Sequence, residues 1–362
     1  MKKTAVTDIP FARRLGRTAA GGSSLSVFWT ASGIEFKLKA TDLFIELESI
    51  YSGLELWIDI MIDGELSQRI QLPPGISTIP VFRNLSDNGE ARSRTVRILR
   101  DTQAMAGDEV SVLRLISAET DDDAVFEQIP EASLRLEFIG DSITSGEGAG
   151  LEKQIEWAPI VFSAVEGYAY KTGILLNADV NVLSSSGWGL YASWDADTAC
   201  ALPRYYDEVC GLEKSDGDAA CGSLEPWDFS SYVPDAIVIN LGTNDSTALK
   251  NSDRWTPDEF NGLFREAAVS FLKKLRDKNP KSAILWAYGM LGNEMAEPIK
   301  DAILAYSGET GDKNVYYYEF KNCTGDRLGV RAHPNRRAHD EAASALSEEI
   351  MRILKKTGGD TK

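Results

Sequence analysis

The chain has 362 residues, of which 43% are hydrophobic and 26% are charged. This composition is ordinary for a globular protein, and the length suits about two domains. The formal net charge of −17 argues against nucleic acid or an anionic membrane as a partner, because phosphate groups would be repelled. Neutral substrates such as sugars and esters stay compatible with this charge.

The N-terminus bears on localisation. No apolar run approaches the roughly 20 residues that cross a bilayer. The first residues include two lysines, as in a signal peptide, but the apolar stretch that should follow is interrupted by Asp8, Pro10, Arg13 and Arg14. As given, the chain is therefore expected to be cytoplasmic, or secreted if a signal segment has been removed.

The cysteines and histidines bear on metal binding. The four cysteines are Cys200, Cys210, Cys221 and Cys323, and their spacing matches no common zinc motif. The chain has only two histidines, which excludes a His-rich metal site. We expect no metal centre. Free thiols are favoured over a disulfide, and the sequence leaves both open.

The first part of the chain alternates between apolar and polar residues with period two. This pattern runs from residue 25 to about residue 120, and residues 54–62 place every second, apolar side chain on one face. The pair Asp63 and Gly64 then gives a hairpin signal. Short alternating strands with frequent turns predict an antiparallel β-sandwich.

The hydrophobic pattern changes after Pro130, where short continuous apolar runs alternate with helical segments. Continuous apolar strands are typical of a parallel sheet that is buried on both faces. The sequence therefore predicts an α/β domain with a parallel central sheet. We place the boundary near residues 125–131, which divides the chain into domains 1–128 and 129–362.

Two helices and one long connection are expected in this second domain. The clearest helix begins with Thr256 as N-cap, Pro257 at the first position and Glu259 completing a capping box. Another helix is expected from about Asn335 to Lys355. The segment from Trp194 to Tyr232 has weak periodicity and is either a solvated insertion, a flap or an oligomer contact, which leaves a homo-oligomer open.

Small or polar residues follow four of the predicted strands. In open α/β sheets, reactive groups collect beyond the carboxyl ends of the strands. Each of these groups taken singly also fits an ordinary turn. The four groups are Gly140-Asp141-Ser142, Ser186-Gly187-Trp188-Gly189, Gly242-Thr243-Asn244-Asp245 and Ala332-His333-Pro334.

Ser142 is the candidate nucleophile. It follows the first strand near the expected start of a helix, where a developing negative charge is favoured. A serine needs a base to attack at neutral pH, and only His333 and His339 can serve as histidines. His333 is preferred, because it lies on a loop before Pro334, whereas His339 lies inside the predicted helix.

Two further residues suit the stabilisation of an oxyanion. The side-chain amide of Asn244 could donate a hydrogen bond, which is typically worth about 3 kcal/mol of reaction barrier. A glycine at position 187 lets a backbone N–H approach a ligand closely. Together with Ser142 and His333, these residues form an ordered set that is far more specific than any one of them.

The order of these motifs resembles the SGNH (GDSL-like) hydrolases. The stretches "FIGDSIT", "INLGTND" and "HPNRRAHDEAA" are similar to the blocks of that family, and the resemblance covers roughly residues 130–355. The preceding β-sandwich narrows the resemblance to carbohydrate esterase family 2, whose members deacetylate xylan and related sugars. This resemblance implies a jelly-roll-like N-terminal sandwich and a C-terminal SGNH-hydrolase α/β/α domain.

The resemblance also implies roles for individual residues. Ser142 corresponds to the nucleophile and His333 to the general base of a Ser-His dyad. The oxyanion hole is formed by the backbone N–H groups of Ser142 and Gly187 and by the side chain of Asn244, with Gly189 as the alternative to Gly187. The reaction needs no metal and no organic cofactor.

One position departs from the wider family. Most members have an aspartate three residues before the histidine, where this chain has Val330. The imidazole still needs a partner for its Nδ1–H. A backbone carbonyl could supply it, as the resemblance to carbohydrate esterase family 2 implies, and Asp326 is a more distant alternative.

The sequence therefore predicts a carboxylic ester hydrolase, similar to acetyl xylan esterases, that removes O-acetyl groups from xylan-derived or related oligosaccharides. The sugar is expected to lie on an aromatic surface, for which Trp188, Trp194, Trp255 and Trp286 are candidates, although each also suits the core. Two alternatives are kept: a lipid esterase or thioesterase on the same fold, and a non-catalytic carbohydrate-binding protein.

Overall fold

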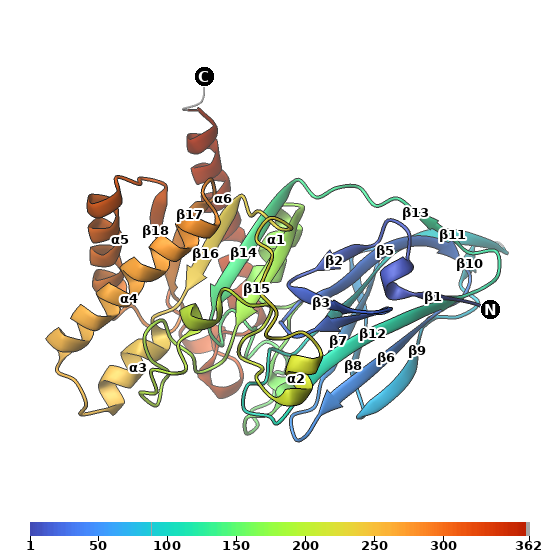
Figure 1. Ribbon diagram of the computed structural model, residues 1–362, viewed down its shortest axis with the longest axis horizontal. Helices are drawn as coiled ribbons and strands as arrows, with labels where there is room; N and C mark the ends of the chain where they lie inside the picture. The colour runs from blue at the N-terminus through green and yellow to red at the C-terminus, as the bar shows by residue number, and fades with distance from the viewer. Residues whose placement is uncertain (88, 360–362) are drawn as a thin grey trace. The chain divides into compact units, whose positions relative to one another are not determined.

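A computed structural model describes residues 1–87 and 89–359, and these form two compact units (Figure 1). The first unit comprises Met1–Glu131 together with the short segments Ala158–Ile160 and Asp207–Trp227, and the second unit holds the rest. The return of two later segments to the first unit is not indicated by the sequence pattern. Within the described residues, no helix has the length and apolar character needed to cross a membrane.

The first unit is built from two antiparallel sheets, which confirms the predicted β-sandwich. One sheet has the order β3-β4-β12-β6-β9, with β1 beside β12, and the other has the order β13-β5-β11-β7-β8, with β2 beside β5 and β10 beside β11. The first sheet contains β1 (Lys2–Ala5), β3 (Thr18–Gly21), β4 (Ser24–Val27), β6 (Leu43–Tyr51), β9 (Gly75–Phe82) and β12 (Ser111–Thr120). The second contains β2 (Arg13–Leu15), β5 (Gly33–Ala40), β7 (Trp57–Ile62), β8 (Glu65–Gln71), β10 (Ser86–Asp87), β11 (Glu90–Arg100) and β13 (Val125–Glu127).

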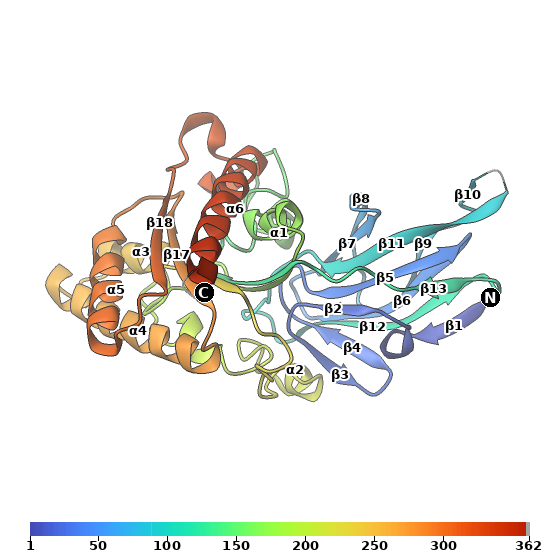
Figure 2. The same ribbon diagram turned by 90° about the horizontal axis from the view of Figure 1, so that it is seen from above.

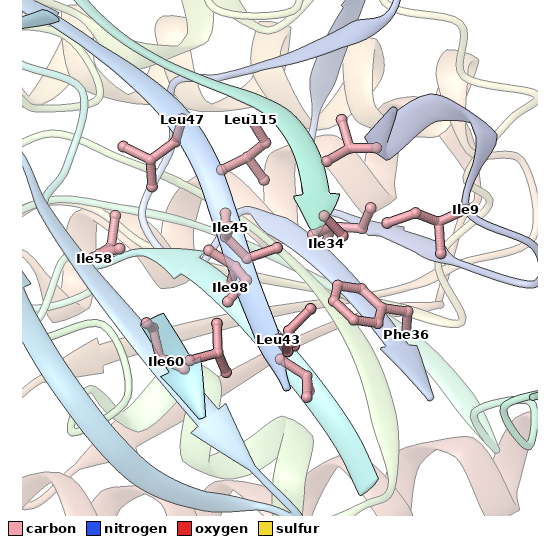
Figure 3. Close-up of a cluster of buried hydrophobic side chains, with 14 of the residues drawn as sticks. Ile9, Ile34, Phe36, Leu43, Ile45, Leu47, Ile58, Ile60, Ile98 and Leu115 are labelled. Carbon is pink, nitrogen blue, oxygen red and sulfur yellow. The ribbon is translucent and has the colours of Figure 1, made fainter. Parts of the chain in front are cut away.

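The core of the sandwich follows from the alternation in the sequence. Along β6, every second side chain is buried, beginning with Leu43, Ile45 and Leu47. These side chains gather with others from both sheets in one apolar cluster (Figure 3). The predicted hairpin joins β7 to β8, and its turn residues Asp63 and Gly64 both have positive φ, as a two-residue type I′ turn requires.

Part of the long connection packs within the first unit and is not simply a solvated insertion. The indole N–H of Trp29 donates to the carbonyl of Val209 at 2.6 Å, and the carboxylate of Asp218 accepts from the backbone N–H of Ser111 at 3.0 Å. The connection contains two short helices, η3 (Leu202–Tyr205) and α2 (Asp216–Ala220). All four cysteines are free thiols.

The second unit has a five-stranded parallel sheet in the order β15-β14-β16-β17-β18, which confirms the predicted α/β/α domain. Helices α1 and α6 pack together on one face, and α4 and α5 pack together on the other (Figure 2). The strands are β14 (Leu134–Gly140), β15 (Ala178–Ser184), β16 (Ala236–Asn240), β17 (Ala283–Gly289) and β18 (Val315–Phe320). The helices are α1 (Tyr168–Leu175), α3 (Thr243–Asn251), α4 (Pro257–Lys278), α5 (Ala296–Thr310) and α6 (Arg336–Gly359).

The two helices expected from the sequence are both present. Helix α4 begins after Thr256, and the capping box with Glu259 is formed in both directions. Helix α6 begins one residue after the expected Asn335 and runs a few residues beyond Lys355. These helices cover the sheet and leave the carboxyl ends of its strands to carry the site.

Candidate active site

The predicted site residues all follow strands of the parallel sheet. Ser142 comes after β14, Gly187 after β15, Asn244 is the second residue of α3 after β16, and His333 follows β18. Strand β15 lies on one side of β14 and the later strands lie on the other, so the strand order reverses at β14. Ligand sites collect at such a reversal in open α/β sheets. All four residues belong to the second unit.

Ser142 does not begin a helix, so the expectation of a helix N-terminus there was wrong. Residues 142–149 form a series of turns, and the next regular α-helix begins only at Tyr168. Gly146 and Gly148 have φ of 77° and 90°, and this left-handed backbone is incompatible with a continuing α-helix. The turns keep Ser142 largely buried, with 6% of its surface exposed.

The structure brings Ser142 and His333 together. The Oγ atom of Ser142 lies 2.9 Å from Nε2 of His333, and Nδ1 of His333 lies 3.1 Å from the carbonyl oxygen of Arg331. A hydroxyl bonded to an imidazole whose other nitrogen is held in place suits nucleophilic attack. Asp326 binds the side chains of Arg327 and Arg337 instead.

His339 is a packing residue. It is fully buried in α6, and its Nδ1 accepts the backbone N–H of Tyr168 at 3.1 Å. Burial, together with the positive charge of Lys171, lowers the pKa of His339 to about 3. Because its accepting nitrogen is engaged inside the unit, His339 is not placed to serve as the base.

Gly187 lies at the third position of a tight turn. The backbone N–H of Trp188 donates to the carbonyl of Ser185 at 3.2 Å, and φ of Gly187 is 81°, as a type II turn requires. A Cβ at this position would approach Trp194 to 2.8 Å. By contrast, the N–H of Gly189 already donates to the carbonyl of Cys200. Within the described part of the chain, the N–H groups of Ser142 and Gly187 have no acceptor.

Asn244 is held by a buried carboxyl that the sequence did not single out. Its amide nitrogen donates to the carbonyl of Trp188 at 2.9 Å and to Asp141 at 3.2 Å. Asp141 also accepts the backbone N–H of Ile143 at 3.0 Å. Burial raises the pKa of Asp141 to about 7, although the N–H of Ile143 acts in the opposite direction. These contacts fix which way the Asn244 amide faces.

Asp245 joins α3 to the segment after β15. Its buried carboxylate accepts the backbone N–H groups of Leu190, Tyr191 and Ala192 at 2.8, 2.7 and 3.1 Å. Burial raises the pKa of Asp245 to about 6, and the three N–H groups oppose this shift. Asn244 therefore contacts Asp141 in the loop after β14, and Asp245 fixes the backbone beyond Gly189 in the loop after β15.

Glu147 is a further buried acid that sequence reasoning missed. Its side chain is 1% exposed, and its Oε2 accepts from the hydroxyl of Ser186 at 2.6 Å and lies 3.7 Å from Nε2 of His333. Its Oε1 lies 3.2 Å from Nε of Arg331. The available signal was an acid between Gly146 and Gly148 in "SGEGAG", in the same stretch as Ser142.

The four candidate tryptophans differ in exposure. Trp286 is fully buried in β17, whereas Trp194 is 54% exposed and adjoins Gly187, because the backbone N–H of Trp194 donates to the carbonyl of Gly187 at 2.9 Å. Trp188 packs against Tyr205, and Trp255 lies among Tyr191, Phe260 and Arg254. Trp194 is therefore the most exposed of the four and adjoins the site.

Comparison with known families matches this part of the chain. The family described as GDSL-like Lipase/Acylhydrolase matches residues 136–346. An acetylxylan esterase / glucomannan deacetylase of Cellvibrio japonicus is 27% identical, over 97% of this chain and 91% of its own length. The matched region contains Ser142, Gly187, Asn244 and His333.

Solved structures are similar over both units. An acetyl xylan esterase from the rumen bacterium Butyrivibrio proteoclasticus is 34% identical, with a TM-score of 0.93 and coverage of 98% of each chain. A family two carbohydrate esterase from Clostridium thermocellum, solved in complex with cellohexaose, is 22% identical, with a TM-score of 0.80 and coverage of 95% of this chain and 99% of its own. The latter likeness shows the shared fold alone.

Proposed function

Because the chain belongs to the SGNH (GDSL-like) hydrolases and, within them, to carbohydrate esterase family 2, we propose that it is a serine esterase that removes O-acetyl groups from xylan-derived or related oligosaccharides. The observation that carries the proposal is the 2.9 Å contact between Ser142 Oγ and His333 Nε2. The carbonyl of Arg331 supports the same dyad, because it accepts from Nδ1 and leaves Nε2 free to take a proton.

In the acylation step, Nε2 of His333 takes the proton of Ser142 as Oγ attacks the acetyl carbonyl carbon. The carbonyl oxygen becomes an oxyanion. When the intermediate collapses, the bond between the acetyl carbon and the sugar oxygen breaks, and His333 returns the proton to that oxygen. The deacetylated sugar leaves and Ser142 carries the acetyl group.

In the deacylation step, water replaces the sugar hydroxyl. His333 takes one proton from the water as the water oxygen attacks the acetyl carbon, and returns it to Ser142 as acetic acid leaves; the acid then loses its remaining proton to solvent and becomes acetate. Apart from the water that is consumed and the solvent that accepts the proton of acetic acid, no group outside the chain takes part in these proton transfers. The dyad therefore returns to its starting state after each turnover.

The proposed oxyanion hole consists of the N–H groups of Ser142 and Gly187 and the amide of Asn244. The two backbone groups support this role, since neither has an acceptor within the described residues. The Asn244 amide nitrogen donates to Trp188 and Asp141, so one of these bonds is exchanged for the bond to the oxyanion. Each such donor typically contributes about 3 kcal/mol.

The acetylated sugar is the proposed substrate because two relatives that the chain matches over nearly its full length are acetyl xylan esterases. The exposed residue Trp194, whose side chain lies beside Gly187, supports a sugar-binding surface at the site. A sugar ring lies well against an aromatic face, which supplies apolar contact without a charge.

The test is acetate release from acetylated xylo-, gluco- and manno-oligosaccharides by the wild type and Ser142→Ala. We expect release by the wild type and a loss of at least about a thousandfold in the variant. Ser270→Ala, which removes an exposed hydroxyl on α4, is the matched control and should keep full activity. Equal release by Ser142→Ala would contradict the proposal.

The same samples separate the two alternatives. A p-nitrophenyl ester series that favours octanoate over acetate would identify a lipid esterase or thioesterase. Failure of an organophosphonate to label Ser142 in the folded wild type would identify a non-catalytic binding protein. One carbohydrate esterase of this fold, 22% identical, is described as displaying divergent catalytic and non-catalytic binding functions at its active site, so this second alternative is tested directly.

A further inference from the structure

The proposed dyad lacks a charged partner at the expected position. Val330 occupies it, and this side chain is fully buried. The group that holds Nδ1 of His333 is the carbonyl of Arg331, which carries a partial charge only. Within the described residues, no hydrogen bond or ion pair joins Nδ1 to a carboxylate, so the positive charge that forms when His333 takes a proton lacks such a partner on that side. A positive charge that forms in a largely buried site is costly unless an opposite charge lies near it.

A carboxylate does lie near the opposite nitrogen. Glu147 Oε2 is 3.7 Å from Nε2 of His333, while Ser142 Oγ is nearer at 2.9 Å. The longer distance exceeds that of a hydrogen bond, so Glu147 leaves the bond between Ser142 and His333 in place. It is nevertheless shorter than the limit of about 4–6 Å within which an opposite charge stabilises an ionised group.

The surroundings of Glu147 supply partners for both oxygens of its carboxylate and fix its position. The hydroxyl of Ser186 donates to Oε2 at 2.6 Å, and Nε of Arg331 lies 3.2 Å from Oε1. The side chain is 1% exposed, so water screens its charge little. The glycine at 148 leaves the room that His333 occupies, because a Cβ there would lie 2.7 Å from Cβ of His333.

Resting on the esterase function proposed above, we propose that Glu147 is the positioning residue whose carboxylate stabilises the protonated form of His333, in the role that an aspartate at position 330 would otherwise fill. It acts from the Nε2 side and belongs to the same turn segment as the nucleophile. The guanidinium of Arg331 opposes this effect, because it also binds the carboxylate of Glu147. The backbone carbonyl and the side chain of Arg331 thus act on the protonated form of His333 in opposite directions.

Other charged groups face this corner of the site. Asp141 follows β14 and Asp245 lies in α3, and both are fully buried carboxyls. Arg331 is the cation on the histidine's own loop, and Arg336 lies beyond it with its Nε on the carbonyl of Ala149. Each variant below changes a single residue and leaves the other charged groups in place. A difference between variants therefore reports on the group that was changed.

The first experiment measures the pKa of His333 by NMR in the full chain, and it needs no substrate. The chain has two histidines, so two imidazole signals are followed, and burial lowers the pKa of His339 to about 3. We expect Glu147→Gln to lower the pKa of His333 by about 1 and Arg331→Gln to raise it. Glu266→Gln, an exposed acid on α4, is the charge control and should leave it unchanged. An unchanged pKa in folded Glu147→Gln would overturn the proposal.

The second experiment is the pH profile of kcat/KM with p-nitrophenyl acetate. In Glu147→Gln, we expect the acidic limb to move to lower pH by about the shift of the His333 pKa, and kcat on the plateau to fall about tenfold. A purely structural role for Glu147 predicts a uniform loss with an unmoved limb, which would contradict the proposal. If the wild type hydrolyses no ester while the NMR shifts appear, the esterase function fails and the action of Glu147 on His333 stands.

Discussion

The carbonyl oxygen of Arg331 lies 3.1 Å from Nδ1 of His333, two residues further along the same loop. This contact depends on an unusual backbone, since Arg331 and Ala332 both have φ of 56°. Left-handed conformations in residues other than glycine cost roughly 1–2 kcal/mol each and are often held at functional sites. The loop therefore orients the imidazole from within itself, without a separate acidic side chain.

Introducing an aspartate at position 330, where most of the wider family has one, should not raise the activity of this site. Val330 is fully buried and Nδ1 of His333 already has an acceptor, so an aspartate introduced by Val330→Asp would bury a carboxylate that gains no partner there. We expect a loss of about 3 kcal/mol in the free energy of unfolding and no rise in kcat. Val330→Ala, which only removes methyl groups, should lose about 2 kcal/mol with kcat nearly unchanged. Urea unfolding and acetate release measure both, and a faster Val330→Asp enzyme would be evidence against the carbonyl as orienter.

The contact between Gly148 and His333 predicts a sensitive position. Gly148 has φ of 90°, and a Cβ would lie 2.7 Å from Cβ of His333 and 2.9 Å from the carbonyl oxygen of Pro334. Gly148→Ala should therefore displace His333, with a loss of more than about tenfold in kcat and about 2 kcal/mol of stability. The control is Gly262→Ala in α4, where a Cβ meets open space and should stabilise the helix by about 0.5–1 kcal/mol. Equal activity of the two variants would contradict the displacement.

Much of this arrangement could be predicted from the sequence, because it depends on local patterns. The period-two alternation of residues 25–120 fixes which side chains enter the sandwich core, and continuous apolar runs identify the parallel strands. Since the carboxyl ends of parallel strands meet at one edge, Ser142 and His333 could be paired before their contact was seen.

The remaining features depend on tertiary contacts or on local backbone conformation that residue type alone does not determine. The positive φ of Arg331 and Ala332 could not be predicted, because neither residue type favours that region. Glu147 lies far from His333 in the sequence, so their proximity follows only from how the two loops fold together. The turns after Ser142 replaced the expected helix because of two glycines whose backbone is left-handed.

Replacing Trp194 should weaken sugar binding while leaving ester hydrolysis itself intact. The residue is 54% exposed beside Gly187, so removal of its side chain should cost little stability. For Trp194→Ala we expect KM for acetylated xylo-oligosaccharide to rise about tenfold, as the loss of an aromatic contact of about 1.4 kcal/mol implies, with kcat/KM for p-nitrophenyl acetate within about twofold of the wild type. Leu304→Ala, which removes a 70% exposed side chain of α5, is the control and should change neither substrate. Equal losses on both substrates would show that Trp194 supports the catalytic loop and does not bind the sugar.

His339 should make the stability of the protein depend on pH. Its pKa is about 3 in the folded chain, below the ordinary 6.5, because burial disfavours its charged form. The unfolded chain therefore binds the extra proton below pH 6.5, and stability is lost as pH falls toward 3. Between pH 7 and pH 5, this group should lower the free energy of unfolding by about 2 kcal/mol. His339→Gln, whose amide oxygen can still accept the N–H of Tyr168, should be less stable than the wild type at pH 7 but should lose about 2 kcal/mol less over this interval. Urea unfolding at both pH values measures the difference, and parallel losses in the two proteins would assign the acid sensitivity to other groups.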